Sequence, residues 1–341
     1  MPDVEVVKLV HGAGGSAMGE LIQELILPGF TLRRALDGVP LDALDDGASI
    51  KLGGHEVVLS IDGHTVDPLF FPGGDIGRLA ISGTVNDLAV MGARPVAILD
   101  AIVVEEGFPI PDLQRIVKSM DEAAREAGVA VVSGDFKCMP RGGVDGVVIA
   151  TCGVGLAENG VILDSGAKPG DRIIVTGPVG DHGVALLAAR EGLGFEAELK
   201  SDVAPVWETV KAMLDVGGIH AMKDPTRGGL ASALNEIAGK SGVSIWLEEE
   251  QIPVRESVKA ASEMLGIDPL EVTCEGRVVA AVDPELAPEV VEAARRTKYG
   301  KDACIIGTVQ KERPGYVLMR TVVGGTRVVQ MPVGEPIPRV C

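Results

Sequence analysis

Three carboxylates lie near the ends of predicted strands or helices, where ligand sites commonly form. Asp62 ends an apolar strand predicted over 57–62, and Asp135 follows another over 129–133. Asp87 lies within an apolar helix, where a buried carboxylate needs a counter-charge such as a metal ion. The alternative for each acid is a solvated turn or a half-exposed helix end. Taken together, the three carboxylates offer the hard oxygen ligands that Mg²⁺ prefers.

Groups suited to phosphates accompany these acids. Lys137 follows Asp135 by two residues, so an acid and a base come together just after a strand. Thr65 places a hydroxyl oxygen close to Asp62 in the sequence. Strand-end acids together with a lysine could form a Mg²⁺–triphosphate site.

Two glycine-rich segments could bring backbone close to a ligand. The first contains Gly12, Gly14 and Gly15 directly before a helix, where N–H groups and the helix dipole favour an anion. A flexible turn is the alternative. The second, DPTRGG, begins at Asp224 and predicts a helix N-terminus with Thr226 as the cap. Capping does not explain its paired glycines, which cost helix stability, whereas close approach to a ligand would.

The last eleven residues, 331–341, differ from the rest of the chain. Prolines at 332, 336 and 338 forbid a helix and leave few backbone donors for docking, so we expect an extended, mobile tail. The tail carries Cys341, and a thiol on a flexible arm fits a carrier of a covalently bound group. A chance terminal cysteine is the alternative.

The remaining acid of interest is Glu275, which precedes a predicted buried strand over 277–282. It is either a general base or an ordinary loop acid. Cys138, Cys152 and Cys304 lie in apolar stretches and are predicted to be inert core thiols. The five cysteines show no zinc-ligand spacing, so we expect reduced thiols in a cytoplasmic protein.

The composition argues against several function classes. Asp and Glu number 49 against 31 Lys and Arg in 341 residues, which gives a net charge of −18. A chain this acidic repels phosphate backbones, so we expect no binding to nucleic acid or to an anionic membrane. The first residues lack a signal-peptide pattern, and the apolar stretches are too short or too charged to span a bilayer.

The periodicity of the chain predicts an α/β (α+β) scaffold in two domains. In the first half, strands alternate with two long helices, over 75–91 and 113–124, and Asp75 caps the first of them. The loop 177–183 is rich in glycine but lacks the dinucleotide fingerprint, so we predict a packing loop. The predicted domains are 1–157 and 158–330, followed by the tail 331–341.

Several motifs together resemble the HypE family of hydrogenase maturation proteins, in the PurM/AIR-synthetase superfamily. They are the HGAGG loop from His11, DGHTVDPLFFPGGD from Asp62, the Asn86–Asp87 helix, GDFK from Gly134, DPTRGG from Asp224 and the final PRVC from Pro338. The resemblance covers the chain from the first of these motifs to its end. It implies a PurM-like fold, in which an N-terminal mixed-sheet domain dimerises to complete a barrel and a C-terminal α/β domain follows.

The resemblance also implies a reaction and partners. A HypF-type carbamoyltransferase would carbamoylate the thiol of Cys341. This chain would then dehydrate the thiocarboxamide to a thiocyanate with ATP, because an amide oxygen leaves only after phosphorylation. The cyanide would pass to iron held by HypC–HypD, for the [NiFe] hydrogenase centre.

The resemblance finally implies roles for the residues above. Mg²⁺ would be held by Asp62, Asp87 and Asp135, and ATP by Lys137, Thr65, Asp224 and the loop of Gly12, Gly14 and Gly15, with Glu275 as base and Cys341 as carrier. One alternative is another ATP-dependent enzyme of the superfamily, resembling AIR synthetase or selenophosphate synthetase, which has no use for a terminal thiol. The other is a scaffold without activity that presents Cys341, which the retained acids and Lys137 disfavour.

Overall fold

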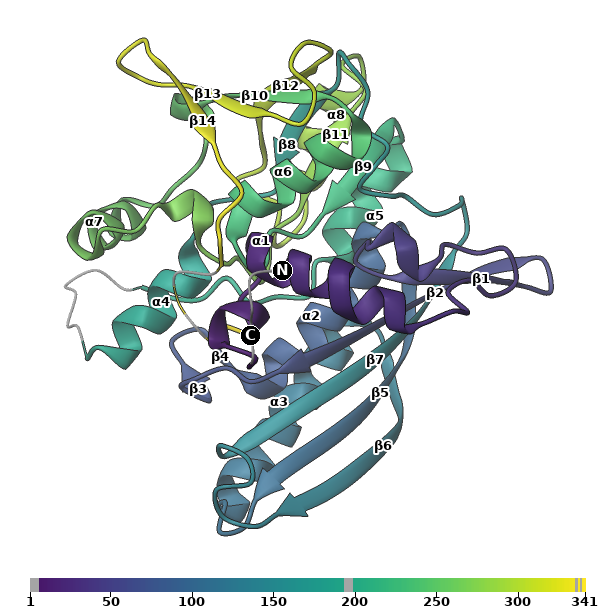
Figure 1. Cartoon of the computed structure of the whole chain (residues 1–341), viewed down its shortest axis with the longest axis vertical. Helices are drawn as coiled ribbons and strands as arrows, with labels where there is room; N and C mark the ends of the chain where they lie inside the picture. The colour runs from purple at the N-terminus through teal and green to yellow at the C-terminus, as the bar shows by residue number, and fades with distance from the viewer. Residues whose placement is uncertain (1–5, 193–198, 335–336, 338) are drawn as a thin grey trace.

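Two β-sheets form the framework of the protein, one from each half of the chain (Figure 1). The computed structural model describes residues 6–192, 199–334, 337 and 339–341. The first sheet has the strand order β1-β2-β7-β5-β6, and the second has the order β14-β13-β10-β12-β8-β11-β9. The predicted α/β architecture is therefore confirmed. None of the described helices is long and apolar enough to cross a membrane.

The N-terminal lobe is a five-stranded sheet with helices on one face. Its main elements are α1 (Gly15–Leu21), β1 (Ala48–Leu52), β2 (His55–His64), α2 (Ile76–Val90), β5 (Arg94–Glu105), α3 (Ile110–Ala127), β6 (Ala130–Met139) and β7 (Val147–Ala157), with the short β3 (Phe70–Phe71) and β4 (Gly74–Asp75). The predicted cap of α2 is confirmed, because Asp75 accepts a hydrogen bond from the Arg78 backbone N–H at 3.0 Å. The helix predicted directly after the glycine loop is present as α1, and it continues as a π-helical turn over Ile22–Ile26.

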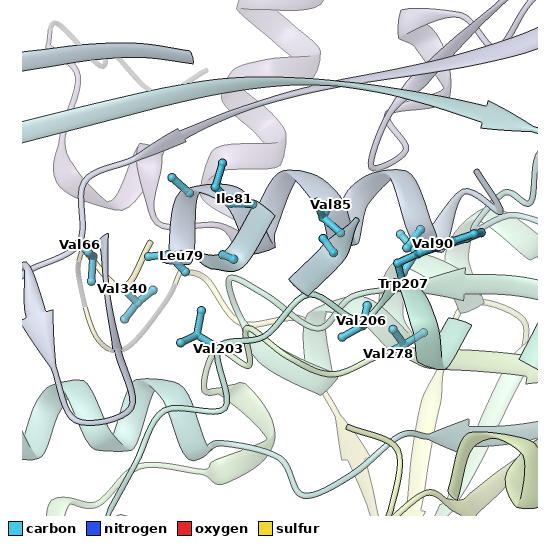
Figure 2. Packing of buried hydrophobic residues seen from close by; sticks show 14 of the residues in the cluster. Val66, Leu79, Ile81, Val85, Val90, Val203, Val206, Trp207, Val278 and Val340 are labelled. Atoms are coloured by element: carbon cyan, nitrogen blue, oxygen red, sulfur yellow. The ribbon is translucent and has the colours of Figure 1, made fainter. Parts of the chain in front are cut away.

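Helix α2 lies at the centre of the molecule, between the two lobes. Nearly all of its residues are buried, because it packs on β2 and β7 on one side and on the C-terminal lobe on the other. Figure 2 shows Val85 and Val90 of α2 facing Val206, Trp207 and Val278 of the C-terminal lobe. The hydrophobic core is thus continuous across both lobes and fixes the side chains at the end of α2.

The opposite face of the first sheet is not covered by any helix in the part of the chain that the structure describes. Buried and partly buried residues alternate along β7, as expected for a sheet with one covered face. Ile61 and Leu99 lie on the uncovered face and are exposed, and every residue of the edge strand β6 is exposed. An open face with exposed apolar side chains and an unpaired strand edge is the kind of surface on which another chain can dock.

The C-terminal lobe packs helices on both faces of its seven-stranded sheet (Figure 1). Its elements are β8 (Arg172–Val175), α4 (Asp181–Arg190), α5 (Trp207–Val216), β9 (Ile219–Lys223), α6 (Gly229–Ser241), β10 (Ser244–Glu248), α7 (Glu256–Leu265), β11 (Val279–Val282), α8 (Ala287–Arg295), β12 (Cys304–Gln310), β13 (Val317–Arg320) and β14 (Thr326–Val329). The prediction that Thr226 caps α6 was wrong. Gly228 is the N-cap residue in a left-handed conformation, φ +80°, which only glycine adopts without strain.

Candidate active site

The tail folds back into the molecule and docks between the two lobes. The Thr65 backbone N–H donates to the main-chain oxygen of Cys341 at 2.8 Å, and that of Asp67 donates to the Arg339 carbonyl at 3.1 Å. Val340 is buried and lies beside Val66 in Figure 2. The expectation that the tail lacks groups for docking was wrong, because the tail docks through its carbonyl acceptors and not through N–H donors. Of its prolines, those at 336 and 338 lie outside the described residues.

The thiol of Cys341 lies in a small cavity of about 240 Å³ that the tail end shares with Gly12, Gly63 and Thr65. The Arg227 guanidinium donates to Cys341 Sγ at 3.1 Å. Burial raises the pKa of this thiol to about 12, and the charges of Glu275 and Asp62 act in the same direction while Arg227 opposes them. The docked thiol is therefore protonated at neutral pH.

A larger cleft of about 520 Å³ adjoins this cavity and has the size of a small-molecule site. Asp46, Asp224 and Glu236 line it together with Lys223 and Lys240, and Gly14 and Gly15 close one end. Arg227 lines both the cleft and the thiol cavity, so the two spaces meet at its side chain.

Buried carboxylates converge on the cleft. Burial raises the pKa of Asp87 well above its usual range, and the nearby charges of Asp224, Asp62 and Asp46 raise it further, while a hydrogen bond from Ser60 opposes them. The pKa of Asp224 is raised to about 8, first by burial and then by Asp46. At neutral pH these acids can all ionise only beside an added positive charge.

One lysine already forms ion pairs with acids of this group. Lys223 Nζ lies 2.5 Å from Asp46 Oδ1 and 3.2 Å from Glu236 Oε2. Asp46 Oδ2, Asp224 Oδ2 and Glu275 Oε1 are nevertheless buried, and the described residues offer them no hydrogen-bond partner. These unpartnered oxygens fit a hard cation in charge and in donor type. Among the described residues, however, no three acidic, histidine or cysteine side chains are already arranged around a metal position.

Asp62 and Asp87 lie in this region, but Asp135 and Lys137 do not. Asp135 on β6 is in register with Ala101 of β5, and strands β5 and β7 lie between β6 and β2. Across the sheet it lines up with Gly63, one residue out of phase with Asp62, so its side chain points to the uncovered face. Asp135 and Lys137 form an exposed ion pair at 2.8 Å. One chain therefore does not bring all the predicted site residues together.

The glycines of the N-terminal loop pack against Arg227 and the tail. Gly14 has φ +73°, and a Cβ there would lie 2.6 Å from Arg227 Cβ. The backbone N–H groups of Ser16 and Ala17 donate to the carbonyls of Pro332 and Val333 at 3.0 and 3.1 Å. The first turn of α1 thus binds the root of the tail, and its contact with phosphate remains a prediction. Gly12 is exposed, and a Cβ added there would meet none of the described atoms within 4 Å.

Several residues of the site were missed by the sequence analysis. Arg227 lies inside the DPTRGG motif, where the sequence analysis assigned roles to Asp224, Thr226 and the glycines but none to the arginine. Asp46 belongs to an acid-rich stretch that resembles a solvated turn, and Lys223 ends a strand that was not predicted. The prediction that Cys138 is a core thiol was also wrong, because it is exposed on the edge strand β6. Glu275, in contrast, is buried, with 3% of its surface exposed.

Comparisons with known proteins agree on one family. The AIR synthase related protein N-terminal and C-terminal domains match residues 44–157 and 168–319. Carbamoyl dehydratase HypE of Azotobacter vinelandii is 50% identical over 98% of this chain and 97% of its own. The HypE–HypF complex superposes with a TM-score of 0.85 at 44% identity, covering 92% of this chain and 99% of that one. HypE in complex with ATP superposes with a TM-score of 0.82 at 42% identity, covering 98% and 100%.

Replacing one buried acid is expected to stabilise the metal-free protein at alkaline pH. The folded-state pKa of Asp224 is raised from 3.8 to about 8, so folding costs free energy once this group ionises. The cost is absent below pH 3.8 and grows until about pH 8. Asp224→Asn should therefore raise the free energy of unfolding at pH 8, in EDTA, by at least about 1 kcal/mol relative to its effect at pH 4. Urea unfolding at both pH values measures it.

The matched control is Asp121→Asn on the exposed surface of α3, where the carboxylate pairs with Arg125 of the same helix. It should change the free energy of unfolding by less than about 0.5 kcal/mol at either pH. An effect of Asp224→Asn that does not differ between pH 4 and pH 8 would contradict the raised pKa.

Proposed function

Because the chain belongs to the HypE family of carbamoyl dehydratases, we propose that Cys341 carries the carbamoyl group that this chain dehydrates with ATP. The family and the ATP-dependent carbamoyl dehydration in hydrogenase maturation, both predicted from the sequence motifs, are confirmed. The observation that carries the proposal is the position of Cys341 Sγ, 3.1 Å from Arg227 and at the junction of the thiol cavity and the cleft.

The reaction converts Cys341–S–C(=O)NH₂ into Cys341–S–C≡N, and ATP becomes ADP and phosphate. Transfer of the γ-phosphoryl group to the amide oxygen turns a poor leaving group into phosphate. The C–O bond then breaks, its oxygen leaves with the phosphate, and both N–H protons leave the nitrogen as the C≡N bond forms. The C–S bond to Cys341 stays intact throughout. The chain must therefore bind the triphosphate, stabilise the transferred charge and accept protons.

We assign these tasks to the groups around the cleft. Arg227 faces the thiol and can stabilise negative charge on the amide oxygen and the phosphoryl group. Glu275 is the proton acceptor, since its Oε1 is buried without a partner and its charge acts on Cys341. Mg²⁺ would compensate the phosphates and the acids of the cleft, and Asp62 and Asp87 would hold it together with Asp46.

We further propose that two chains form a homodimer that completes the site. The uncovered apolar face of the first sheet and the free edge of β6 offer the surface for it. Asp135 and Lys137 lie on this edge strand, away from Asp62 of the same chain. A second copy would present its own Asp135 and Lys137 to the cleft, which gives both residues the metal and phosphate roles predicted for them.

The partners follow from the chemistry of the carried group. A HypF-type carbamoyltransferase supplies the carbamoyl group, and we propose that a HypC–HypD complex accepts the cyanide. We propose that Cys341 leaves the cavity for both transfers, because the docked thiol is only partly exposed and is protonated. We also propose that the chain works in the cytoplasm, where its five free cysteines would stay reduced.

Cys341→Ala tests the carrier role. The variant should bind ATP with unchanged affinity, since the thiol lies outside the larger cleft, but it should accept no carbamoyl group from the HypF-type partner. Mass spectrometry of the intact chain measures the adduct, and Cys138→Ala is the control that should be carbamoylated like the wild type. A carbamoyl adduct in good yield on Cys341→Ala would refute the carrier role.

Glu275→Gln tests the proton acceptor. Burial first, and then Asp224 and Asp62, raise the pKa of Glu275 well above 4.5, so dehydration should speed up as the pH rises through that raised value. The variant should bind ATP normally, react at least about 100-fold more slowly and lose this pH dependence. Single-turnover assays of carbamoylated protein at several pH values give the profile. Loss of ATP binding in the variant would instead make Glu275 a structural residue or metal ligand.

Mixed dimers test the shared site. Asp87→Asn and Lys137→Ala should each abolish ATP turnover alone, because each site would lack one charged group. Co-expressed with different tags, the two variants should recover about a quarter of wild-type turnover, since half of the dimers are mixed and one of their two sites is complete. Asp87→Asn with Asp62→Asn is the control and should recover nothing. Absence of recovery in the first pair would place Lys137 outside the partner's site.

A further inference from the structure

We propose that His182 is a positioning residue that fixes the register of the tail and so holds the Cys341 thiol beside Arg227. The inference rests on the proposed function of Cys341 and adds a residue to it. His182 lies in the first turn of α4, inside the glycine-rich loop that the sequence predicts to be a packing loop. Its Nε2 lies 2.7 Å from the Val340 carbonyl oxygen, and its Nδ1 lies 2.7 Å from Ser201 Oγ.

The hydrogen bonds around His182 have one consistent direction. Ser201 Oγ accepts from the Val203 backbone N–H at 3.0 Å, so the Ser201 hydroxyl proton is free to point at His182 Nδ1. The ring proton then resides on Nε2 and points at the Val340 carbonyl. Burial also lowers the pKa of His182, which favours this neutral form. The imidazole is thus a fixed donor aimed at a single tail carbonyl.

This donor acts on the side of the tail that the N-terminal lobe does not reach. The main-chain oxygens of Arg339 and Cys341 accept from Asp67 and Thr65 of the N-terminal lobe, and the Val340 carbonyl between them turns to His182 of the C-terminal lobe. The last residues of the tail therefore bridge both lobes through their main-chain oxygens.

Side-chain donors add to the register that the backbone sets, because Arg190 Nη2 donates to the Arg339 carbonyl at 2.5 Å and His182 donates to the next carbonyl, that of Val340. Backbone pairing with Thr65 and Asp67 alone is compatible with a slip of two residues, which preserves the faces of the strand. A slip would carry Cys341 away from Arg227 by about 7 Å. The packing of Ile337 over Gly183, where a Cβ would lie 3.2 Å from Ile337 Cδ1, supports the same register from the adjacent residue of α4.

The consequence of losing this donor is specific to the tail. Val340 is 2% exposed, so its carbonyl would stay buried without a partner and the docked population would fall. His182 does not line the larger cleft, so the affinity for ATP should not change. The expected defect is therefore slower dehydration of the carried group with normal nucleotide binding.

Two amide variants separate the hydrogen bond from simple packing. Glutamine places its side-chain N–H₂ near the position of Nε2 and can still donate to the Val340 carbonyl, whereas asparagine reaches only the position of Nδ1. Both variants lose the edge-on contact of His182 with Phe71, so the loss of this contact does not contribute to the difference between them. The readout is the rate at which N-ethylmaleimide labels Cys341, followed by mass spectrometry of the C-terminal peptide.

The expected result is about five- to tenfold faster labelling in His182→Asn, with labelling in His182→Gln within about twofold of wild type. Single-turnover dehydration should slow in His182→Asn only, with ATP affinity unchanged and any change in thermal unfolding equal in the two variants. Should a variant fail to fold, Ser201→Ala removes the partner that fixes the ring proton and should give an intermediate increase.

Labelling of His182→Asn at the wild-type rate would overturn the proposal. Equal acceleration in both variants would also overturn it, since it would make His182 a packing residue. If no chain shows dehydration, the proposed function fails, and the labelling contrast between the two variants still supports the docking role by itself.

Discussion

Repulsion among buried carboxylates is the constraint on which the rest of the structure depends. Burial and neighbouring charges raise the pKa of Asp87, Asp224 and Glu275, so ionisation of each of these acids costs free energy. Lys223 and Arg227 relieve part of this cost, and unpartnered oxygens remain buried. A triphosphate would be repelled from such a cleft unless divalent cations came with it. In a chain of net charge −18, the same cluster that resists folding at alkaline pH would therefore, under the proposed function, favour a nucleotide that arrives with divalent cations.

The dipeptide at the end of α2 connects this cluster to the architecture. Asn86 Nδ2 donates to the carbonyls of Ala204 and Glu275, each at 3.1 Å, and its Oδ1 accepts from the Val206 backbone N–H at 2.8 Å. The neighbouring Asp87 takes part in the group of acids. One buried helix thus ties the lobes together, holds the backbone of the proposed base and supplies a proposed metal ligand. The tail docks across the same junction, so the thiol meets the cleft only when the lobes are correctly placed.

Local sequence patterns predicted much of the fold, but they could not predict contacts between residues that are distant in the sequence. Asp75 before an apolar run gave the start of α2, and the apolar setting of Asp87 indicated a carboxylate buried for a purpose. The face on which Asp135 points depends on register across β5 and β7, which no local pattern encodes. The docking of Cys341 depends on Thr65 and Arg227, which are far away in the sequence. Arg227 was missed because the local pattern of its motif indicated only a helix start and paired glycines, whereas its contact with Cys341 joins residues 114 positions apart.

The most direct test of the account follows the mass of the C-terminal peptide. Wild-type protein is first carbamoylated by the HypF-type partner and then given Mg²⁺ and ATP in a single turnover. The account predicts that the peptide containing Cys341 gains one carbamoyl group and then loses the mass of one water, and that this loss requires ATP. A carbamoyl group that persists on Cys341 with ATP present, or a loss of water located on another cysteine, would contradict the central claim that the docked terminal thiol is where dehydration occurs.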